Sequence, residues 1–272
     1  MKNKSSLILA IILLVSCATV PITGRRQLSL ISNSELIPLS FENYKKVLTE
    51  GVLSTNMENT EMVKRVGTRI QYAVEDFMEK NGYIKQLEGF EWDFNLIEND
   101  SVVNAWCMPG GKVAFYSGIL SICEDELGVA VVMGHEIAHA IANHSRERMS
   151  QQMAVNGILS IGSAAVGSGA VNDIFLQSVG MGSQIGLLKF SRNNESEADH
   201  MGLIFMAIAG YEPSAAPLFW QRMSALSEGS QTAEWLSTHP SHDRRISDLQ
   251  EWQNEAAKYY TKKENSNTGV QL

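Results

Sequence analysis

Apolar and polar residues along the chain follow two periods, which together predict a mainly helical protein with a small β region. Apolar residues recur every three or four positions in six stretches, which predicts helices at residues 34–50, 60–80, 127–142, 195–209, 214–226 and 245–260. Strict alternation predicts a half-buried strand at 90–96, and two more strands are expected at 101–108 and 112–117. A short apolar helix is expected at 119–122. The expected fold class is therefore α+β, mainly helical.

The first residues of the chain have the pattern of an export signal. Lys2 and Lys4 precede an apolar run at 7–15, which is too short to cross a bilayer comfortably. The run ends in Leu-Val-Ser-Cys at 14–17, which resembles the lipobox of bacterial lipoproteins. We therefore expect a signal peptide at 1–16, a lipid on Cys17, and over 17–34 a tether with a first anchoring segment. An ordinary signal peptide cleaved at a nearby small residue is the alternative.

Ala18 follows the expected lipidated cysteine, where an Asp would be the retention signal of Gram-negative bacteria. This resembles outer-membrane sorting, so we expect a periplasm-facing lipoprotein of the bacterial envelope, held to the membrane by its lipid alone. Residues 35–260 are expected to form one domain, and residues 261–272 a polar, disordered tail. The Gly-, Ala- and Ser-rich segment 146–184 favours a helical hairpin or a mobile cover over a pair of membrane spans.

Composition and charge narrow the classes of partner. The chain has 272 residues, of which 44% are hydrophobic, so it can bury a substantial core. Its formal net charge of −8 argues against nucleic acid as a partner, because phosphate binding requires a basic face. Three cysteines do not make a disulfide framework. Cys107 and Cys123 could pair in an oxidising compartment or remain buried thiols, and the sequence leaves both alternatives open.

The strongest chemical signal is the sequence HEIAH at residues 135–139, which lies in the most apolar expected helix. His135 and His139 are one helical turn apart, so both imidazoles point the same way and can bind one zinc ion. Glu136 lies beside them and is free to act on a water molecule. If the helix continues, His144 faces away from this pair and has a structural or capping role.

A catalytic zinc ion takes three protein ligands, so a third is needed. Glu195 and Asp199 are one turn apart on the expected helix at 195–209 and share one of its faces. Glu195 could be the third ligand, and Asp199 could orient a ligating histidine. Glu197 points elsewhere and is expected to be solvated. Without the HEIAH motif, these carboxylates would be read as an ordinary solvent-exposed face.

Together these motifs resemble one family of zinc peptidases, that of the CAAX prenyl protease and HtpX. The resemblance is strongest to its soluble periplasmic lipoprotein branch, of the BepA and LoiP type, and covers residues 21–253. It rests on four segments of this sequence, HEIAHAIANH at 135–144, ESEAD at 195–199, Asn-Ala at 104–105 before Pro-Gly-Gly at 109–111, and Thr-His-Pro at 238–240.

The resemblance implies a gluzincin-type metallopeptidase domain over 35–260, with a small sheet beside the motif helix. It implies one zinc ion per chain, with His135, His139 and Glu195 as ligands and Glu136 as general base. It also implies an edge strand near 104–108 that holds a peptide by strand addition. The substrate-binding residues expected there are Asn104, Ala105 and Trp106. Trp106 and Cys107 depart from the smaller or apolar residues common at these positions.

His239 and Arg245 resemble family positions close to the active site. His239 could donate to the transition-state oxyanion, could approach the zinc and hold the enzyme closed, or could serve loop architecture. Arg245 could serve the same loop or the oxyanion.

The function expected is zinc-dependent endopeptidase activity on polypeptides, with misfolded envelope proteins as the substrates that the resemblance suggests. The alternatives are a self-inhibited or chaperone-like zinc protein with little proteolysis, and a purely structural zinc site with His239 as fourth ligand.

Overall fold

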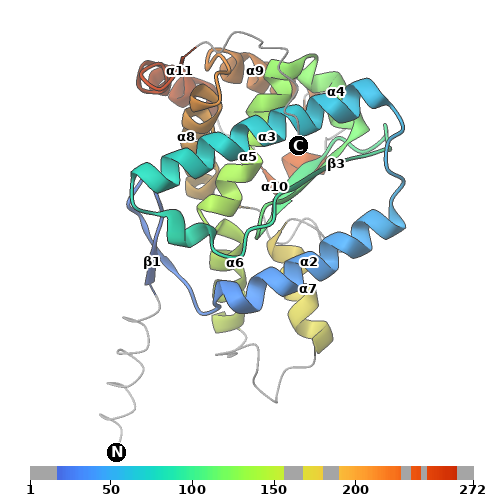
Figure 1. Cartoon of the computed structure of the whole chain (residues 1–272), viewed down its shortest axis with the longest axis vertical. Helices are drawn as coiled ribbons and strands as arrows, with labels where there is room; N and C mark the ends of the chain where they lie inside the picture. The colour runs from blue at the N-terminus through green and yellow to red at the C-terminus, as the bar shows by residue number, and fades with distance from the viewer. Residues whose placement is uncertain (1–16, 156–167, 180–189, 228–233, 240–243, 262–272) are drawn as a thin grey trace, which may run out of the picture.

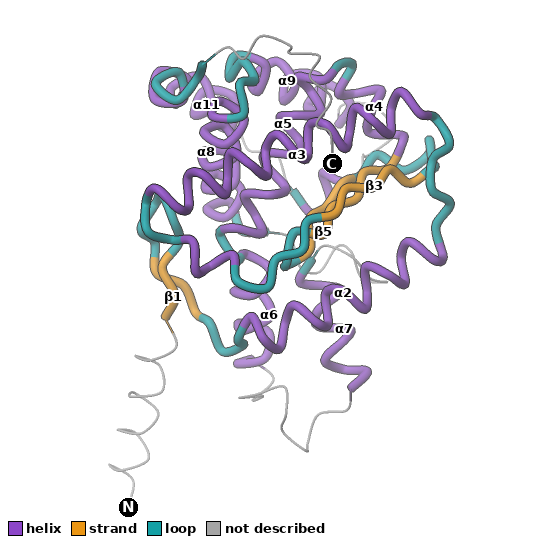
Figure 2. Tube along the Cα trace, viewed as in Figure 1, coloured by secondary structure: helices purple, strands orange, loops and turns teal. Residues whose placement is uncertain are grey.

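A computed structural model of the chain describes residues 17–155, 168–179, 190–227, 234–239 and 244–261. Helices predominate, and a small sheet lies among them (Figures 1 and 2). This confirms the expected mainly helical α+β class. The longer helices are α2 (Asn33–Glu50), α3 (Met57–Lys80), α5 (Glu126–Ile141), α6 (His144–Val155), α7 (Ser168–Ser178), α8 (Arg192–Ile208), α9 (Ala215–Ser227) and α11 (Arg245–Ala256). The shorter ones are the 3-10 helix η1 (Ile84–Leu87), α4 (Ser117–Cys123) and α10 (Glu234–Thr238).

Helix α5 lies at the centre of the molecule because it is apolar on every side. Each of its residues from Gly128 to Ile141 is buried, as expected for a helix surrounded by others. The Asp125 side chain caps its first turn by accepting a hydrogen bond from the Gly128 backbone N–H at 2.9 Å. Asn143 ends it with a positive φ of 57°, a conformation that asparagine tolerates better than most residues.

Helices α5 and α8 cross with their backbones in close contact. Gly134 of α5 faces Gly202 of α8, and a Cβ built on Gly202 would lie 2.8 Å from the Gly134 carbonyl carbon. Only glycine at both positions allows this approach. The contact brings the carboxylates at the start of α8 toward the histidines in the second half of α5.

The sheet has three strands in the order β3 (Asp93–Ile97), β5 (Lys112–Tyr116), β4 (Ala105–Met108). Strand β5 pairs with β3 in parallel and with β4 in antiparallel fashion. Figure 1 shows the sheet between α3 and α2. One face of β4, with Ala105 and Cys107, joins the core formed with α3, α5 and α8. The other face, with Trp106 and Met108, packs with α2, α6 and α7. Strand β4 therefore lies at the edge, where the edge strand was expected.

The N-terminal segment, expected to be a tether with a first anchoring segment, is fixed to the domain from β1 onward. Its two antiparallel strands, β1 (Cys17–Thr19) and β2 (Arg26–Leu28), form the N-terminal hairpin (residues 17–28). Helix α2 also begins within the segment. Val20 is fully buried in the main core, and the Gln27 side chain donates to the Ala142 carbonyl at 2.9 Å. Buried apolar surface and hydrogen bonds thus fix the segment on the domain. The expected signal peptide at 1–16 and the polar tail from 262 onward lie outside the described residues.

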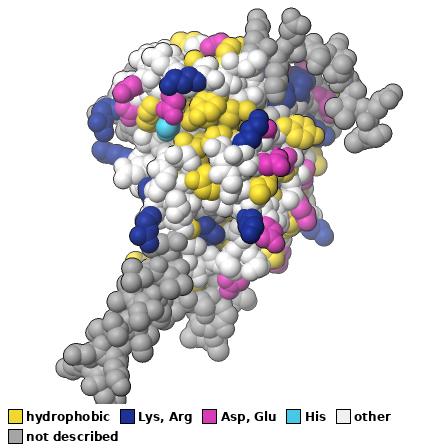
Figure 3. All heavy atoms as spheres, turned by 60° about the vertical axis from the view of Figure 1, so that its left-hand side comes forward, with side chains coloured by type: hydrophobic (Ala, Val, Ile, Leu, Met, Phe, Trp, Pro, Cys, Tyr) yellow, Lys and Arg dark blue, Asp and Glu magenta, His cyan; other side chains and the backbone are white. Residues whose placement is uncertain are grey.

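The Gly-, Ala- and Ser-rich region contains α6 and α7, which share one apolar cluster through Met149, Met153 and Phe175. This agrees with a helical hairpin, although residues 156–167 and 180–189 lie outside the described part. Among the helices that the structure describes, none has the length and apolar content needed to cross a bilayer. On the face drawn in Figure 3, basic and acidic side chains are mixed among hydrophobic ones.

Candidate metal centre

Helix α5 presents His135, Glu136 and His139 to one buried point. Each of the three is only 2% exposed. The two Nε2 atoms of the histidines lie 3.0 Å apart, because residues four apart on a helix stack on one face. The spacing in the sequence therefore produces the juxtaposition that was expected of it.

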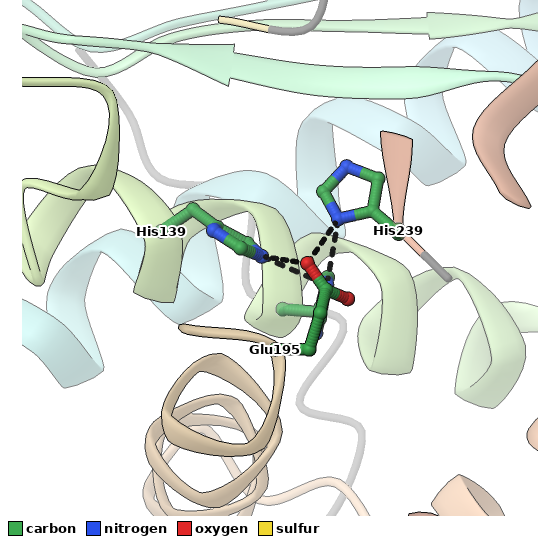
Figure 4. Close-up of side chains that lie close together, drawn as sticks. His139, Glu195 and His239 are labelled. Carbon is green, nitrogen blue, oxygen red and sulfur yellow. Dashed lines mark hydrogen bonds and ion pairs between the residues drawn. The ribbon is translucent and has the colours of Figure 1, made fainter. Parts of the chain in front are cut away.

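Helix α8 brings Glu195 to the same point from a distant part of the chain. Ser191 and Asn194 form a capping box that begins the helix, so Glu195 falls in its first turn. The Glu195 carboxylate is fully buried and lies 3.5 Å from His135 Nε2 and 3.4 Å from His139 Nε2. Figure 4 shows its carboxylate pointing between His139 and His239.

His239, at the end of α10, completes a group of four candidate ligands. Its Nδ1 lies 3.0 Å from Glu195 Oε1 and 3.3 Å from His135 Nε2. One ligand atom from each of His135, His139, Glu195 and His239 can be chosen so that all four lie within 4.8 Å of one another. The sequence left three roles open for His239, and the structure places it beside the other three candidate ligands.

The donor set fits zinc. Three imidazole nitrogens and a carboxylate oxygen are ligands that zinc takes, and ligands at about 2.0–2.1 Å in a tetrahedron lie roughly 3.3–3.4 Å apart. His135 Nε2 lies 3.0 Å from His139 Nε2 and 3.3 Å from His239 Nδ1, and one or other Glu195 oxygen lies 3.0 to 3.5 Å from each of these three nitrogens. These separations are close to tetrahedral spacing, and all four ligand atoms lie within 4.8 Å of one another. If all four side chains bind zinc, the site is a structural one. It can be catalytic only if His239 leaves the zinc and a water molecule takes its place.

Asp199 and Arg245 form hydrogen bonds with two of the candidate ligands, His135 and Glu195. Asp199 Oδ1 lies 2.9 Å from His135 Nδ1, which leaves Nε2 of that ring facing the other ligands. Arg245 donates to Glu195 at 3.0 Å and to Asp199 at 2.7 Å. Arg245 is 1% exposed, and its guanidinium carbon lies 3.2 Å from the centre of the Trp220 ring. These contacts bury Arg245 behind Glu195 and Asp199, where it can fix their positions.

The charges within the cluster compensate one another. Burial alone would lower the pKa of His135, but its bonds to Asp199 and Glu195 raise that pKa to about 9. Burial would raise the pKa of Glu195, but His239, Arg245 and the two α5 histidines hold it well below its ordinary value. The lowered pKa favours the ionised form of Glu195, which binds a metal ion, whereas His135 must give up its extra proton to bind one.

Glu136 has a partner that the sequence did not reveal. The indole N–H of Trp235, in α10, donates to Glu136 Oε1 at 2.6 Å, and His239 Nε2 lies 3.6 Å from the same oxygen. Burial raises the pKa of Glu136, while His239, His135 and the Trp235 hydrogen bond oppose the rise. A buried carboxylate with a raised pKa is suited to accept a proton near neutral pH.

The expectation that Glu197 is solvated was wrong. Its side chain is 5% exposed and bonds to His144 Nε2 at 2.9 Å and to Arg25 Nε at 2.8 Å. The N-terminal hairpin covers the face of α8 that the pattern of the helix alone would leave to solvent. His144 also differs in position, because α5 ends before it and a turn at Asn143 brings His144 back against His139.

The residues expected to bind substrate lie at and before the start of β4. Asn104, Ala105 and Trp106 are all buried, at 5%, 1% and 4% exposure. The backbone carbonyl of Val103, just before this strand, accepts a hydrogen bond from the backbone N–H of Trp235 at 3.1 Å. Helix α10 therefore contacts the segment that leads into β4, and His239 at its end lies among the candidate ligands. Cys107 and Cys123 are both free and buried, and burial raises the pKa of each thiol.

Comparison with known proteins identifies the family of this fold and site. The model of Peptidase family M48 matches residues 65–253, a segment that includes all four candidate ligands. The chain belongs to peptidase family M48. Metallopeptidases of this family use zinc, in agreement with the donor set. The resemblance stated from the sequence is thus confirmed at the level of the family.

Curated relatives come from mitochondria and from bacteria. The chain is 34% identical to the mitochondrial metalloendopeptidase OMA1 of Schizosaccharomyces pombe, over 87% of this chain and 66% of that protein. It is 32% identical to the mitochondrial metalloendopeptidase OMA1 of Saccharomyces cerevisiae, over 67% and 53%. It is also 32% identical to the beta-barrel assembly-enhancing protease of Yersinia pestis, over 57% and 33%. The chain spans less than two thirds of the length of each of these relatives.

Proposed function

We propose that this member of peptidase family M48 is a zinc-dependent endopeptidase. The observation that carries the proposal is the buried convergence of His135, His139 and Glu195, with Glu136 beside them. The ligand atoms of these three residues lie 3.0 to 3.5 Å apart, although Glu195 comes from a different helix. The names of the curated relatives, which are metalloendopeptidases and a protease, support the same class of reaction.

In this proposal His135, His139 and Glu195 hold the zinc ion. Zinc bound there supplies a Lewis acid that polarises the scissile carbonyl and makes a water molecule more acidic. Glu136, whose carboxylate lies beside the candidate ligands, would accept a proton from the attacking water and pass it to the leaving amine. Trp235 fixes the orientation of the Glu136 carboxylate, and Arg245 fixes that of Glu195. The buried surroundings exclude bulk water from the proton transfer.

A second candidate function is a zinc protein that is held closed and cleaves little. The position of His239 favours it, because its Nδ1 lies among the ligand atoms at 3.0 and 3.3 Å. A protein in which all four side chains bind has no open position for water. If His239 holds the enzyme closed, His239→Ala raises the rate of cleavage. If His239 donates to the oxyanion, the same change lowers it.

We further propose that the substrates are polypeptides bound in extended form along β4, and that they are misfolded proteins of a bacterial envelope. The lipobox-like residues 14–17 support a periplasm-facing lipoprotein of the outer membrane, in the branch of BepA and LoiP. The Yersinia pestis relative supports a bacterial envelope role, whereas the OMA1 relatives are mitochondrial.

Radioactive palmitate fed to a Gram-negative host tests the lipid anchor: it should label the wild type and not Cys17→Ala. An unlabelled wild type excludes it.

The catalytic proposal is tested by cleavage of casein and of a fluorogenic peptide before and after chelation, with zinc then restored. Glu136→Gln should keep its zinc and its unfolding midpoint yet lose about 10²–10⁴-fold in kcat. Glu88→Gln, at an exposed position, is the matched control and should behave as the wild type. Wild-type cleavage by Glu136→Gln, or cleavage that survives complete removal of zinc, contradicts the proposal.

A further inference from the structure

His139 contacts a second histidine on the side of its ring that faces away from the candidate metal ligands. Its Nδ1 lies 2.9 Å from His144 Nδ1, while its Nε2 faces His135 and Glu195. Both rings are buried, with 2% exposure for His139 and none for His144. His144 owes this position to Asn143, whose left-handed backbone ends α5 and turns the next helix back.

The contact continues from His144 to the N-terminal hairpin. His144 Nε2 lies 2.9 Å from Glu197 Oε2. Glu197 accepts a hydrogen bond from Arg25 Nε at 2.8 Å and another from the Thr23 hydroxyl. Arg25 also donates to both carboxylate oxygens of Glu147, each at 2.9 Å, so its guanidinium is fixed between two helices. A continuous series of hydrogen bonds therefore joins residues 23–25 to His139.

The order of the protons in this series follows from the role of His139. A histidine that offers the Nε2 lone pair to a metal carries its proton on Nδ1, so His139 Nδ1–H must donate to His144 Nδ1. His144 then carries its own proton on Nε2 and donates it to the Glu197 carboxylate. Every donor meets an acceptor in this arrangement, and both rings stay neutral. Outer partners of this kind fix the tautomer and orientation of metal-ligating histidines.

We propose that His144 and Glu197, held by Arg25, are positioning residues that orient His139 for zinc binding. The inference rests on the proposed function, because it takes His139 as a zinc ligand. Helix α8 then supports both histidines of the HEIAH motif. Asp199 holds His135 directly, at 2.9 Å, and Glu197 holds His139 through His144. The N-terminal hairpin becomes part of the metal centre, although Arg25 touches no candidate ligand itself.

The experiment measures zinc affinity of the full chain after signal removal, by competition with a chromophoric chelator. The wild type is compared with His144→Ala, His144→Asn, Glu197→Gln and Glu255→Gln. Asparagine places an amide oxygen near the position of His144 Nδ1, so it keeps the acceptor for His139 but loses the link to Glu197. Glu255→Gln is the matched control, because Glu255 makes a similar bond of 2.8 Å to His200, which is not among the candidate ligands.

We expect His144→Ala to weaken zinc binding about 10–100-fold, the usual effect of losing an outer partner of a ligand. His144→Asn should recover most of that loss, and Glu197→Gln should lose several-fold. Glu255→Gln should match the wild type. Cobalt(II) in place of zinc gives a second readout: its visible absorption bands, which report the geometry of the ligands, should change in His144→Ala and recover in His144→Asn. If His144 were needed only for folding, His144→Asn would not restore both the zinc affinity and the cobalt spectrum.

Two results would overturn the inference: zinc affinity of His144→Ala equal to that of the wild type, or His144→Asn as weak as His144→Ala. Urea unfolding shows whether each variant is folded. If His144→Ala does not fold, Glu197→Gln is the deciding variant, because the substitution keeps the size of the side chain. A zinc affinity of Glu197→Gln equal to that of Glu255→Gln would then overturn the inference. A wild type that binds no zinc would instead defeat the proposed function itself.

Discussion

Ionisable side chains are concentrated where none of them reaches solvent. His135, Glu136, His139, Glu195 and Arg245 are each no more than 2% exposed. Unpaired charges at such depth would cost several kcal/mol each, so each must have a partner. The structure supplies these partners from four helices: α5 and α8 carry the histidines, Glu136, Glu195 and Asp199, α10 carries Trp235, and α11 carries Arg245. The hydrogen bonds of these partners fix the candidate ligands in an orientation suited to metal binding.

Trp235→Phe tests the support of the candidate general base. The change removes the indole N–H that donates to Glu136 at 2.6 Å, while a ring remains to stack on Trp220, whose centre lies 5.0 Å away. A hydrogen bond to a charged group contributes about 1.5–3 kcal/mol, so we expect kcat to fall about 10-fold or more. Zinc content and KM should change little, since the lost hydrogen bond is to Glu136, which is not a candidate ligand, and an aromatic ring remains beside His135 and His239.

The matched control is Trp252→Phe, on α11, where the ring packs on His200 rather than on Glu136. Steady-state kinetics on a peptide substrate distinguish the two variants. Equal kcat for Trp235→Phe and the wild type would remove Trp235 from the catalytic account.

At the scale of residues, the sequence predicts contacts within one helix and misses contacts between distant segments. His135 and His139 share a face because the pitch of the helix fixes their relation, and Glu195 and Asp199 follow the same rule. The environment of Glu197 depends on Arg25, which is 172 positions away. Helical periodicity cannot say which segment covers a face. The hydrogen bond between Trp235 and Glu136 could not be predicted for the same reason, because nothing in the spacing of the sequence relates the two residues.

Among the elements, the crossing of α5 and α8 determines whether the ligands meet. Helix α5 carries two of the candidate ligands and α8 carries the third, and the crossing point at Gly134 and Gly202 lies beside His135. A shift of either helix would separate Glu195 from the histidines. Stability and metal binding are therefore coupled through this one contact.

Gly202→Ala tests that coupling. The added Cβ would lie 2.8 Å from the backbone of Gly134 and from the His135 N, and neither atom belongs to a flexible side chain. We expect a loss of about 1–3 kcal/mol in the free energy of unfolding, as for other overpacked sites, together with reduced zinc content. Urea unfolding and metal analysis measure the two effects.

Gly169→Ala, in α7, is the control, because a Cβ there meets nothing within 4 Å. Alanine is favoured over glycine in a helix, so this control should be neutral or slightly stabilising. If Gly202→Ala is as stable as Gly169→Ala and binds as much zinc, the helices do not depend on this contact.

The start of α5 gives a prediction on pH. Glu126 accepts hydrogen bonds from Arg65 at 2.7 Å and from the Tyr211 hydroxyl at 2.8 Å. Partial burial opposes ionisation, but these bonds lower the pKa of Glu126 below its ordinary 4.5. A depressed pKa in the folded state contributes stability above pH 4.5, and that contribution is lost as the pH falls through the folded pKa.

Glu126→Gln should therefore lower the free energy of unfolding by about 1 kcal/mol at pH 7, as for a half-exposed ion pair. The difference from the wild type should shrink below pH 4.5. Urea titrations across this range measure it, with Glu124→Gln, whose side chain is 60% exposed, as control. A difference that grows toward low pH would contradict the assignment.

At the scale of elements, the periodic helices and the three strands of the sheet are found close to where the sequence predicts them. Their ends differ by a few residues, because caps such as Ser191 and Asn143 set them locally. The N-terminal hairpin was not foreseen. Its strands have three residues each, too few for a pattern to show, and it is held by Val20 and Arg25 through contacts with distant residues.

Over the whole molecule, α5, α8 and α10 meet at the candidate metal centre (Figures 1 and 4), and the N-terminal hairpin is joined to it through Glu197 and His144. If Cys17 carries the proposed lipid, no free spacer separates that lipid from β1, which begins at Cys17. The domain would then lie close to the membrane surface. The same hairpin that meets the membrane would support His139 through Arg25.

The central claim is that His135, His139 and Glu195 bind one catalytic zinc ion. It is tested most directly by metal analysis and peptidase assay of the purified chain, with wild type and Glu195→Ala side by side. We predict about one zinc per wild-type chain, and loss of both zinc and peptide cleavage in Glu195→Ala. Retention of a full zinc ion and of cleavage by Glu195→Ala would contradict it.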